Sequence, residues 1–430
     1  MSHAHLVTEP SVKPATGAAV IPRATLILLG AILLGETTIN YIDRQVVSVL
    51  APTLRDEFGW SNTQYATVIN AFLITYAVAY SFAGWVLDKL GVRRGLTLSV
   101  AWWSAAGALT SLSRGLFSMS AFRSLLAIGE AGAWPSFAKA ASTWVPAEGR
   151  ALFIGACNSG SSLGAMIAAP LVAVIATSTN WRLAFVATGV IGFVWVGVFQ
   201  IFIRRHPEFA EADDSTVQQK RRLWLAFLAY RQTWAVFLCR FLADPLWYLF
   251  VFWMPEFLAR ERGLGLLGIG KVAWIPFLFA DVSNFVTGYI SMRLHRAGWS
   301  VNRIRKTLMT ISACVSPIGI LAVYAHSVFW TIAIICVAIF FWMFWSVTVH
   351  TLAGDYFPSS EVGSVYGIAG TGSTIGTAIA TWGVGYVLDL RWGYAPVFIG
   401  MSVLMPIALI VGLSVMGRVE PVKALESTAA

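Results

Sequence analysis

The chain has 430 residues, of which 57% are hydrophobic and only 12% are charged, and its mean hydropathy is +0.70. These values exclude an ordinary soluble globular protein, in which about 25% of residues are charged. The formal net charge of +9 would suit a nucleic-acid partner, but basic residues also gather in the cytoplasmic loops of membrane proteins. We therefore expect a protein that crosses the lipid bilayer many times and binds no nucleic acid.

The first 22 residues are polar and lack the short apolar core and cleavage site of a signal peptide, so we expect a cytoplasmic tail. Apolar runs of about 20 residues, long enough to span a bilayer, follow. In the first half they cover 24–50, 64–87, 95–112, 115–140, 150–177 and 183–203; in the second half they cover 233–259, 268–293, 304–324, 328–353, 361–388 and 394–417.

One long polar segment separates these two sets of six spans. The predicted organisation is a tail (1–22), an N-terminal half (23–203), a cytoplasmic linker (204–232), a C-terminal half (233–418) and a tail (419–430). Most Lys and Arg residues fall in the tails and in alternate loops, which predicts that both termini are cytoplasmic. We expect the cell inner membrane, with the lipid bilayer as surroundings and a monomer as the functional unit.

An internal repeat supports two related halves, as in many secondary transporters. A shift of 212 residues superimposes Gly160, Ser161 and Gly164 on Gly372, Ser373 and Gly376. The run from Gly160 to Gly164 also fits the Gly-x-Ser-x-Gly elbow of hydrolases, but that elbow requires a turn between a strand and a helix. The glycines instead predict places where helices approach closely.

Charged residues inside the predicted spans mark the candidate site, because charge in hydrocarbon usually has a function. Glu36, Asp43 and Arg44 lie in the first span, and Arg123 and Glu130 lie two turns apart in the fourth. Counting from the ends of these antiparallel spans places Asp43 level with Arg123, and Glu36 level with Glu130. We expect an outer layer of Asp43, Arg44 and Arg123, and an inner layer of two acids without an obvious cation. The alternative is two static ion pairs, Asp43 with Arg44 and Arg123 with Glu130.

The loop from Gly84 to Gly95 resembles the Gly-x-x-x-Asp-x-x-Gly-x-Arg-Arg signature of the major facilitator superfamily. The resemblance implies an all-α membrane fold of twelve helices in two pseudo-symmetric six-helix halves. It also implies a gating latch formed by Asp88, Arg93 and Arg94. The corresponding loop of the second half has Met292 where the acid would be, so a second latch is not expected.

Other segments resemble the anion:cation symporter branch of that superfamily, and within it the proton symporters of hexuronates and other sugar acids. The segments are 40–44, 123–135, 147–151, 158–164, 240–248 and 279–281. The resemblance implies uptake of an organic anion with protons. It assigns proton coupling to Asp43 and Glu130 and substrate hydrogen bonds to Tyr41 and Tyr76. It gives Glu36 no role, but the depth of Glu36 makes it a candidate second proton site.

Arg44 or Arg123 is expected to receive the substrate carboxylate, since a guanidinium can donate two parallel hydrogen bonds to it. Arg240 with Asp244, and Asp281 with Asn284, are interpreted mainly as structural pairs. Further candidate substrate contacts offer aromatic faces, hydroxyls or amides suited to a polyol: Asn158, Ser161, Trp247, Tyr248, Asn284, Thr371 and Ser373.

The predicted function is a proton-coupled symporter that imports a sugar acid, foremost a hexuronate such as galacturonate or glucuronate. The alternatives are a transporter of another organic anion (an aldonate, an aldarate or an organophosphate) and a membrane sensor that does not transport. Four cysteines inside spans and a lone His350 show no metal-ligand spacing. We expect no enzyme activity, cofactor or metal.

Overall fold

The computed structural model describes residues 22–145, 150–207, 209, 224–357 and 359–422, and its regular elements are all helices. The N-terminal half contains α1 (Arg23–Val49), α2 (Ala51–Phe58), α3 (Asn62–Leu109), α4 (Leu116–Glu130), α5 (Ala133–Trp144), α6 (Arg150–Ser178) and α7 (Trp181–Arg205). The C-terminal half contains α9 (Arg231–Arg262), α10 (Leu266–Val272), α11 (Ile275–Arg296), α12 (Val301–Val315), α13 (Leu321–Tyr324), α14 (Val328–Tyr356), α15 (Ser359–Asp389) and α16 (Tyr394–Met416).

Nine stretches within the described residues are long and apolar enough to cross a membrane, and each corresponds to a predicted span. The other three predicted spans are also helical. Two of the twelve share α3, which is interrupted at Gly91, where φ is 76° and ψ is 166°. A third is divided between α4 and α5. The predicted all-helical membrane fold is therefore confirmed.

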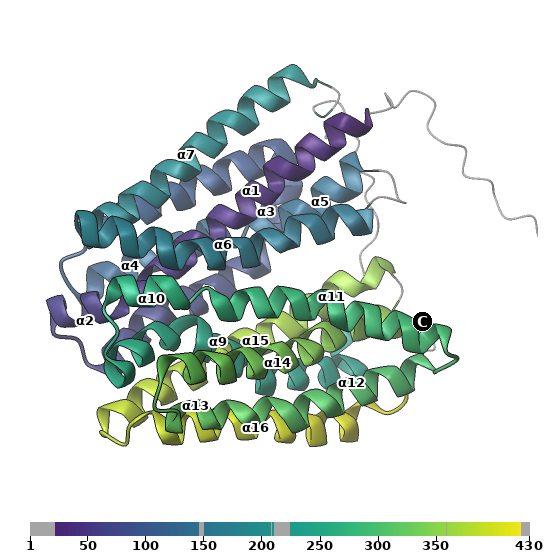
Figure 1. Ribbon diagram of the computed structural model, residues 1–430. Helices are drawn as coiled ribbons and strands as arrows, with labels where there is room; N and C mark the ends of the chain where they lie inside the picture. Colours follow the sequence, from purple (N-terminus) through teal and green to yellow (C-terminus); the bar gives the residue numbers. More distant parts are fainter. Residues whose placement is uncertain (1–21, 146–149, 208, 210–223, 358, 423–430) are drawn as a thin grey trace, which may run out of the picture.

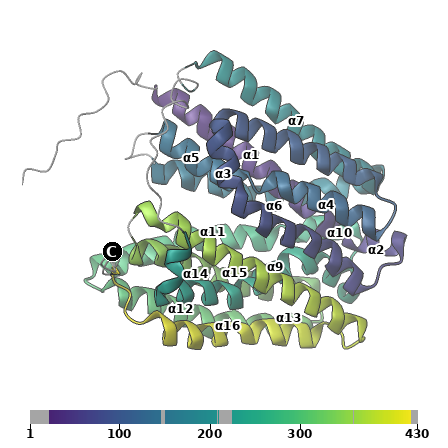
Figure 2. The ribbon, with the colours of Figure 1, turned by 180° about the vertical axis from the view of Figure 1, so that it is seen from behind.

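The two halves form two adjacent groups of helices, with α1 to α7 in one and α9 to α16 in the other (Figure 1). The view from behind shows the same grouping (Figure 2). We use "α2 end" for the end of the molecule that carries α2, α10 and the turn after α15. The first and last described residues lie at the opposite end (Figure 1).

Contacts between the halves are well developed at the α2 end. Glu256 of α9 accepts hydrogen bonds from Arg55 of α2 and from Arg260 of its own helix, and Arg260 also pairs with Asp56. The Asp389 carboxylate, at the end of α15, accepts hydrogen bonds from the first backbone N–H groups of α3 (2.7 and 2.9 Å). These bonds cap a helix of one half with an acid from the other.

The repeated glycines lie where helices cross closely, as predicted. A Cβ atom at Gly160 would lie 2.5 Å from the carbonyl oxygen of Leu34, and one at Gly164 would overlap the carbonyl of Thr38. In the other half, a Cβ at Gly372 would lie 2.8 Å from the Phe237 ring, and one at Gly376 would overlap the carbonyl of Phe241. The pair α6 and α1 thus packs in the same way as the pair α15 and α9.

Candidate functional site

The centre of the N-terminal half holds a buried ion pair between α1 and α4. Arg44 donates from Nε (3.1 Å) and Nη2 (2.7 Å) to one carboxylate oxygen of Glu130. The Glu130 side chain is fully buried and that of Arg44 is 7% exposed. The second oxygen of Glu130 has no hydrogen-bond partner among the described residues. This pair is incompletely satisfied, so it can be rearranged at lower cost than a fully bonded one.

The expected division into two layers is wrong in one respect. Arg44 does not accompany Asp43 in an outer layer but extends along α1 to Glu130, the acid that was expected to lack a cation. The side chains of Arg44 and Glu130 together bridge the difference in depth between the layers. The alternative pairing of Arg44 with Asp43 and of Arg123 with Glu130 is not what the structure contains either.

Arg123 instead holds the backbone of α1. Its Nη1 donates to the carbonyl oxygen of Asp43 (3.3 Å) and its Nη2 to that of Arg44 (3.4 Å). The side chain is almost completely buried, while its Nε has no hydrogen-bond partner in the part of the chain that is described. Of the two arginines expected to bind a carboxylate, Arg123 is thus committed to helix packing and Arg44 is the better placed.

Two further acids are buried near this pair. The carboxylate oxygens of Glu36 and of Asp43 have no hydrogen-bond partner among the described side chains. Glu36 interacts electrostatically with Glu130, as expected from their similar depth. Asp43 lies near Thr188 and Arg123, but the Thr188 hydroxyl donates to the carbonyl of Phe185 (3.2 Å). An unpaired buried carboxylate is expensive to keep charged.

Aromatic rings surround the guanidinium of Arg44. Its central carbon lies 5.0 Å from the ring centres of Tyr41 and Tyr76 and 5.1 Å from that of Phe72. The α3 rings form a stack from Phe72 through Tyr76 to Tyr80, with centroids 5.7 Å apart at each step. The predicted substrate-binding residues Tyr41, Arg44 and Tyr76 are therefore brought together.

The C-terminal half contributes a second charged pair facing this aromatic group. Nε of Arg240 donates to Asp244 one turn away (3.0 Å), and the guanidinium lies 5.2 Å from the Tyr366 ring centre. Tyr248 interacts electrostatically both with this pair and with Arg44. The pairing of Arg240 with Asp244 agrees with the structural interpretation, and the position of the pair beside the site goes beyond it.

The other candidate substrate contacts are less closely grouped. Trp247 stacks on Trp342 with ring centres 5.1 Å apart, and Thr371 donates to the carbonyl of Gly367 in its own helix (3.2 Å). Asn284 interacts with Asp281 of the same helix. Ser373 is buried and Ser161 is half-buried, whereas the side chain of Asn158 lies outside the described residues.

The predicted latch can be examined only in part, because the side chain of Asp88 lies outside the described residues. Gly91 breaks α3 between that acid and the two arginines, Arg93 and Arg94. The positive φ of 76° at Gly91 favours glycine, since other residues rarely adopt it. The turn fits the signature, and the role of Asp88, Arg93 and Arg94 as a latch stays a prediction.

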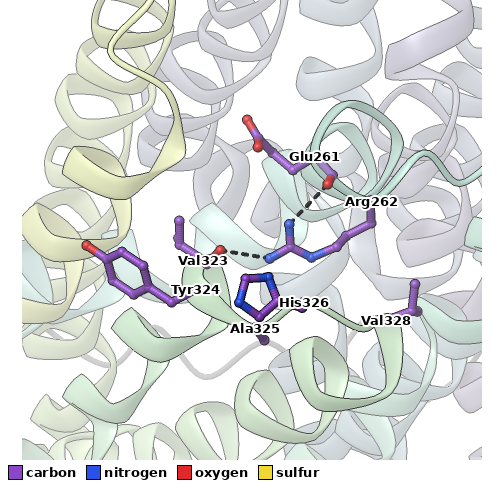
Figure 3. A pocket seen from close by; sticks show the side chains of 7 residues that line it. All are labelled: Glu261, Arg262, Val323, Tyr324, Ala325, His326 and Val328. Atoms are coloured by element: carbon purple, nitrogen blue, oxygen red, sulfur yellow. Dashed lines mark hydrogen bonds between the residues drawn. The ribbon is translucent and has the colours of Figure 1, made fainter.

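A surface pocket of about 480 Å³ lies at the α2 end of the C-terminal half, away from the arginine–tyrosine group. In Figure 3 the guanidinium of Arg262 points toward the backbone carbonyls of Val323 in α13 and of Glu261. Arg262 donates to the carbonyls of Ala322 (2.8 Å) and Val323 (2.9 Å) and to the hydroxyl of Thr331 (2.9 Å). This arginine therefore joins the end of α9 to α13 and α14 and has little hydrogen-bonding capacity left for a ligand.

Sequence reasoning did not include Phe72 or Tyr80 in the site. Their spacing offered the necessary signal, because residues four apart share a helix face and Tyr76 lies midway between them. It also assigned no role to the contact of Glu256 with Arg55. That contact joins residues about 200 positions apart, and no local pattern reveals it.

A buried arginine and several acids within a membrane-spanning helical bundle of two related halves are typical of a membrane transporter. Residues 33–300 match the family model described as Major Facilitator Superfamily. The chain belongs to this superfamily.

Known relatives agree with this assignment. The chain is 31% identical over 395 residues to a protein named hexuronate transporter from Escherichia coli K12, covering 87% of this chain and 90% of the relative. It is 32% identical over 303 residues to one named galacturonate transporter from Dickeya chrysanthemi, covering 66% and 87%. The fold is also similar to that of a solved bacterial homologue of the human lysosomal transporter Spinster, in an inward-facing and unoccupied conformation. The TM-score is 0.71 and the sequence identity is 17%, and the match covers 92% of this chain and 96% of that chain.

Proposed function

We propose that this protein is a proton-coupled symporter that imports a sugar acid, foremost a hexuronate, across the cell inner membrane with both termini in the cytoplasm. The names of the relatives support the substrate class. The observation that carries the proposal is the arrangement around Arg44, where one guanidinium lies between aromatic and hydroxyl groups suited to a sugar and is balanced by a buried acid.

Arg44 is the group proposed to receive the substrate carboxylate. Nε and Nη2 both point to Glu130, so a substrate carboxylate and an ionised Glu130 compete for the same donors. Protonation of Glu130 would weaken this ion pair and release Arg44 for the substrate. Proton binding and anion binding then favour one another, and this reciprocity is the thermodynamic basis of coupling.

Glu36 and Asp43 are proposed to extend the proton route from Glu130. Both are buried without a hydrogen-bond partner in the described structure, and Glu36 of α1 interacts electrostatically with Glu130 of α4. A neutral carboxyl is favoured at such a site because desolvation penalises the charged form. Glu36 and Asp43 therefore provide positions at which a proton can reside before or after Glu130.

The test compares Glu130→Gln with the parent in proteoliposomes, with labelled galacturonate outside; the vesicles contain unlabelled galacturonate for exchange and are empty for uptake driven by a pH gradient. Because Gln mimics the protonated acid, we expect exchange of internal for external substrate to continue while uptake driven by a pH gradient is lost. Glu57→Gln is a matched control, because it makes the same chemical change at an acid that bonds to Arg182 and Trp181 at the α2 end. Uptake driven by a pH gradient that is unchanged in Glu130→Gln would remove Glu130 from the coupling mechanism.

A further inference from the structure

The ion pair of Arg240 and Asp244 has an unused donor next to the site. Asp244 is buried and accepts the Nε–H of Arg240 (3.0 Å). Nη1 of Arg240 is buried and has no hydrogen-bond partner among the residues that the structure describes. The backbone of Gly370 leaves room beside this nitrogen, since a Cβ atom added at Gly370 would lie 3.8 Å from it, an ordinary van der Waals distance. The guanidinium thus keeps part of its hydrogen-bonding capacity free.

This pair lies close to the aromatic group around Arg44. Tyr248 interacts electrostatically with Arg44 and also with Arg240 and Asp244. Tyr366, over which Arg240 stacks, also interacts with Tyr41 of the other half. Tyr366 is 37% exposed although it lies between the two halves. A molecule bound at Arg44 would therefore extend toward the Arg240–Asp244 pair.

The internal repeat gives an independent reason to place the pair at the site. The carbonyl that a Cβ at Gly164 would overlap belongs to Thr38 of α1, and the one at Gly376 belongs to Phe241 of α9, an offset of 203 residues. The same offset relates Tyr41, which borders Arg44, to Asp244. The repeat therefore places Asp244 in the C-terminal half where the N-terminal half has a residue of the site.

We propose that the Arg240–Asp244 pair recognises the end of the sugar acid remote from Arg44 and selects an uncharged, hydroxyl-bearing end over a second carboxylate. A hydroxyl can donate to the Asp244 carboxylate and accept from Nη1 of Arg240, which satisfies both groups. A second carboxylate can only accept, and it meets the like charge of Asp244. Such an unfavourable contact is a common source of specificity.

This inference rests on the proposed transport of sugar acids, and two probes distinguish them. Galacturonate and galactarate have the same carboxylate at one end and differ at the other, where galactarate carries a second carboxylate. Binding of each to purified protein is measured by thermal shift and by competition with labelled galacturonate. The variant is Asp244→Asn, which removes the negative charge with little change of shape. Asp355→Asn is the control, since Asp355 pairs with Arg305 (2.8 Å) within the same half.

The parent is expected to bind galacturonate more tightly than galactarate. In Asp244→Asn the ratio of the two dissociation constants is expected to shift toward galactarate by about tenfold or more, because like charges in a binding site are strongly unfavourable. Asp355→Asn should keep the parental ratio. Asp244→Ser provides a second variant without the charge should Asn impair folding.

The outcomes separate the two proposals. An unchanged ratio in both Asp244 variants, with galacturonate still bound, would overturn the role of the pair and leave the proposed function intact. A parent protein that binds neither acid, or only neutral galactose, would overturn the proposed function itself. A shift of the same size in Asp355→Asn would show a general effect of charge, and it would likewise refute the selective role of the Arg240–Asp244 pair.

Discussion

Closure of the α2 end is predicted to depend on Glu256, the fully buried acid that joins the two halves. Its Oε1 accepts from Arg55 of the N-terminal half and from Arg260. If the halves rock about the central site during transport, these bonds must break each time the α2 end opens. Glu256→Gln keeps an acceptor oxygen in place but removes the charge, and it should shift the equilibrium toward an open α2 end.

The size of this shift follows from the exposure of the partners. The Arg260 side chain is 43% exposed, so solvent screens its bond and little is lost there. The Arg55 side chain is only 12% exposed. Replacing a hydrogen bond to a charged acceptor by one to a neutral acceptor costs about 1 to 2 kcal/mol. The ratio of open to closed molecules should therefore rise by about 5- to 30-fold.

The assay is double electron–electron resonance between two spin labels at the α2 end, one on each half. Leu112 and Leu267 are exposed positions for the labels, introduced as cysteines after the four native cysteines are replaced by serine. Glu256→Gln should increase the population with the longer distance. Labels at these sites report the opening directly and do not require substrate.

Glu57→Gln is the matched control for this experiment. Glu57 accepts hydrogen bonds from Arg182 (3.1 Å) and Trp181, so it lies at the same end but bonds only within the N-terminal half. Its loss should leave the distance distribution unchanged. Equal distributions in Glu256→Gln and the parent, or the same shift in Glu57→Gln, would refute the role of Glu256 in closing the α2 end.

Two further predictions concern packing and pH. Gly376→Ala should lower the midpoint of thermal unfolding in detergent by several degrees, since its Cβ would overlap the Phe241 backbone and overpacking costs about 1–3 kcal/mol. Gly383→Ala, with no atom within 4 Å of its Cβ, should leave the midpoint unchanged. Equal midpoints in the two variants would refute the close packing of α15 on α9 at Gly376. Partial burial raises the pKa of Asp389, at the surface of the α2 end, but hydrogen bonds from Thr63 and Asn62 outweigh it and lower the pKa from 3.8 to about 2. The contribution of Asp389 to closure of the α2 end is thus fully present above pH 3.8 and is lost as the pH falls through about 2. The spin-label distances should therefore stay the same between pH 8 and pH 5. A change over this range in the parent that is absent in Asp389→Asn would contradict the lowered pKa of Asp389.

The sequence predicted the fold well because its signals were strong and local. Twelve apolar runs, a polar linker and a repeat of glycines were enough to predict two helical halves, and the spacing of Gly160 and Gly164 identified a helix crossing. The break at Gly91 could be placed only approximately, because a single residue with positive φ replaces the loop that hydropathy suggested.

It was harder to predict which residues of the site pair with each other than to predict which residues belong to it. Depth along antiparallel helices correctly placed Glu36 near Glu130 and Asp43 near Arg123. The prediction for Arg44 was wrong because depth was counted at the Cα atom, whereas a guanidinium extends several ångströms from it. Side-chain reach, and not helix position, decides the partner of a long cation.

The pairing of Arg44 with Glu130 bears on how a transporter can exclude leakage of protons. If Arg44 bonded Asp43 on the same helix, the ion pair would be local and substrate could bind without disturbing α4. Because the pair instead joins α1 to α4, any anion that takes Arg44 also releases an acid of a second helix. The cost of leaving Glu130 charged and unpaired is high in a buried site, so under the proposed coupling the substrate would bind favourably only when Glu130 is protonated. The long reach of Arg44 would then be what makes the proposed coupling strict.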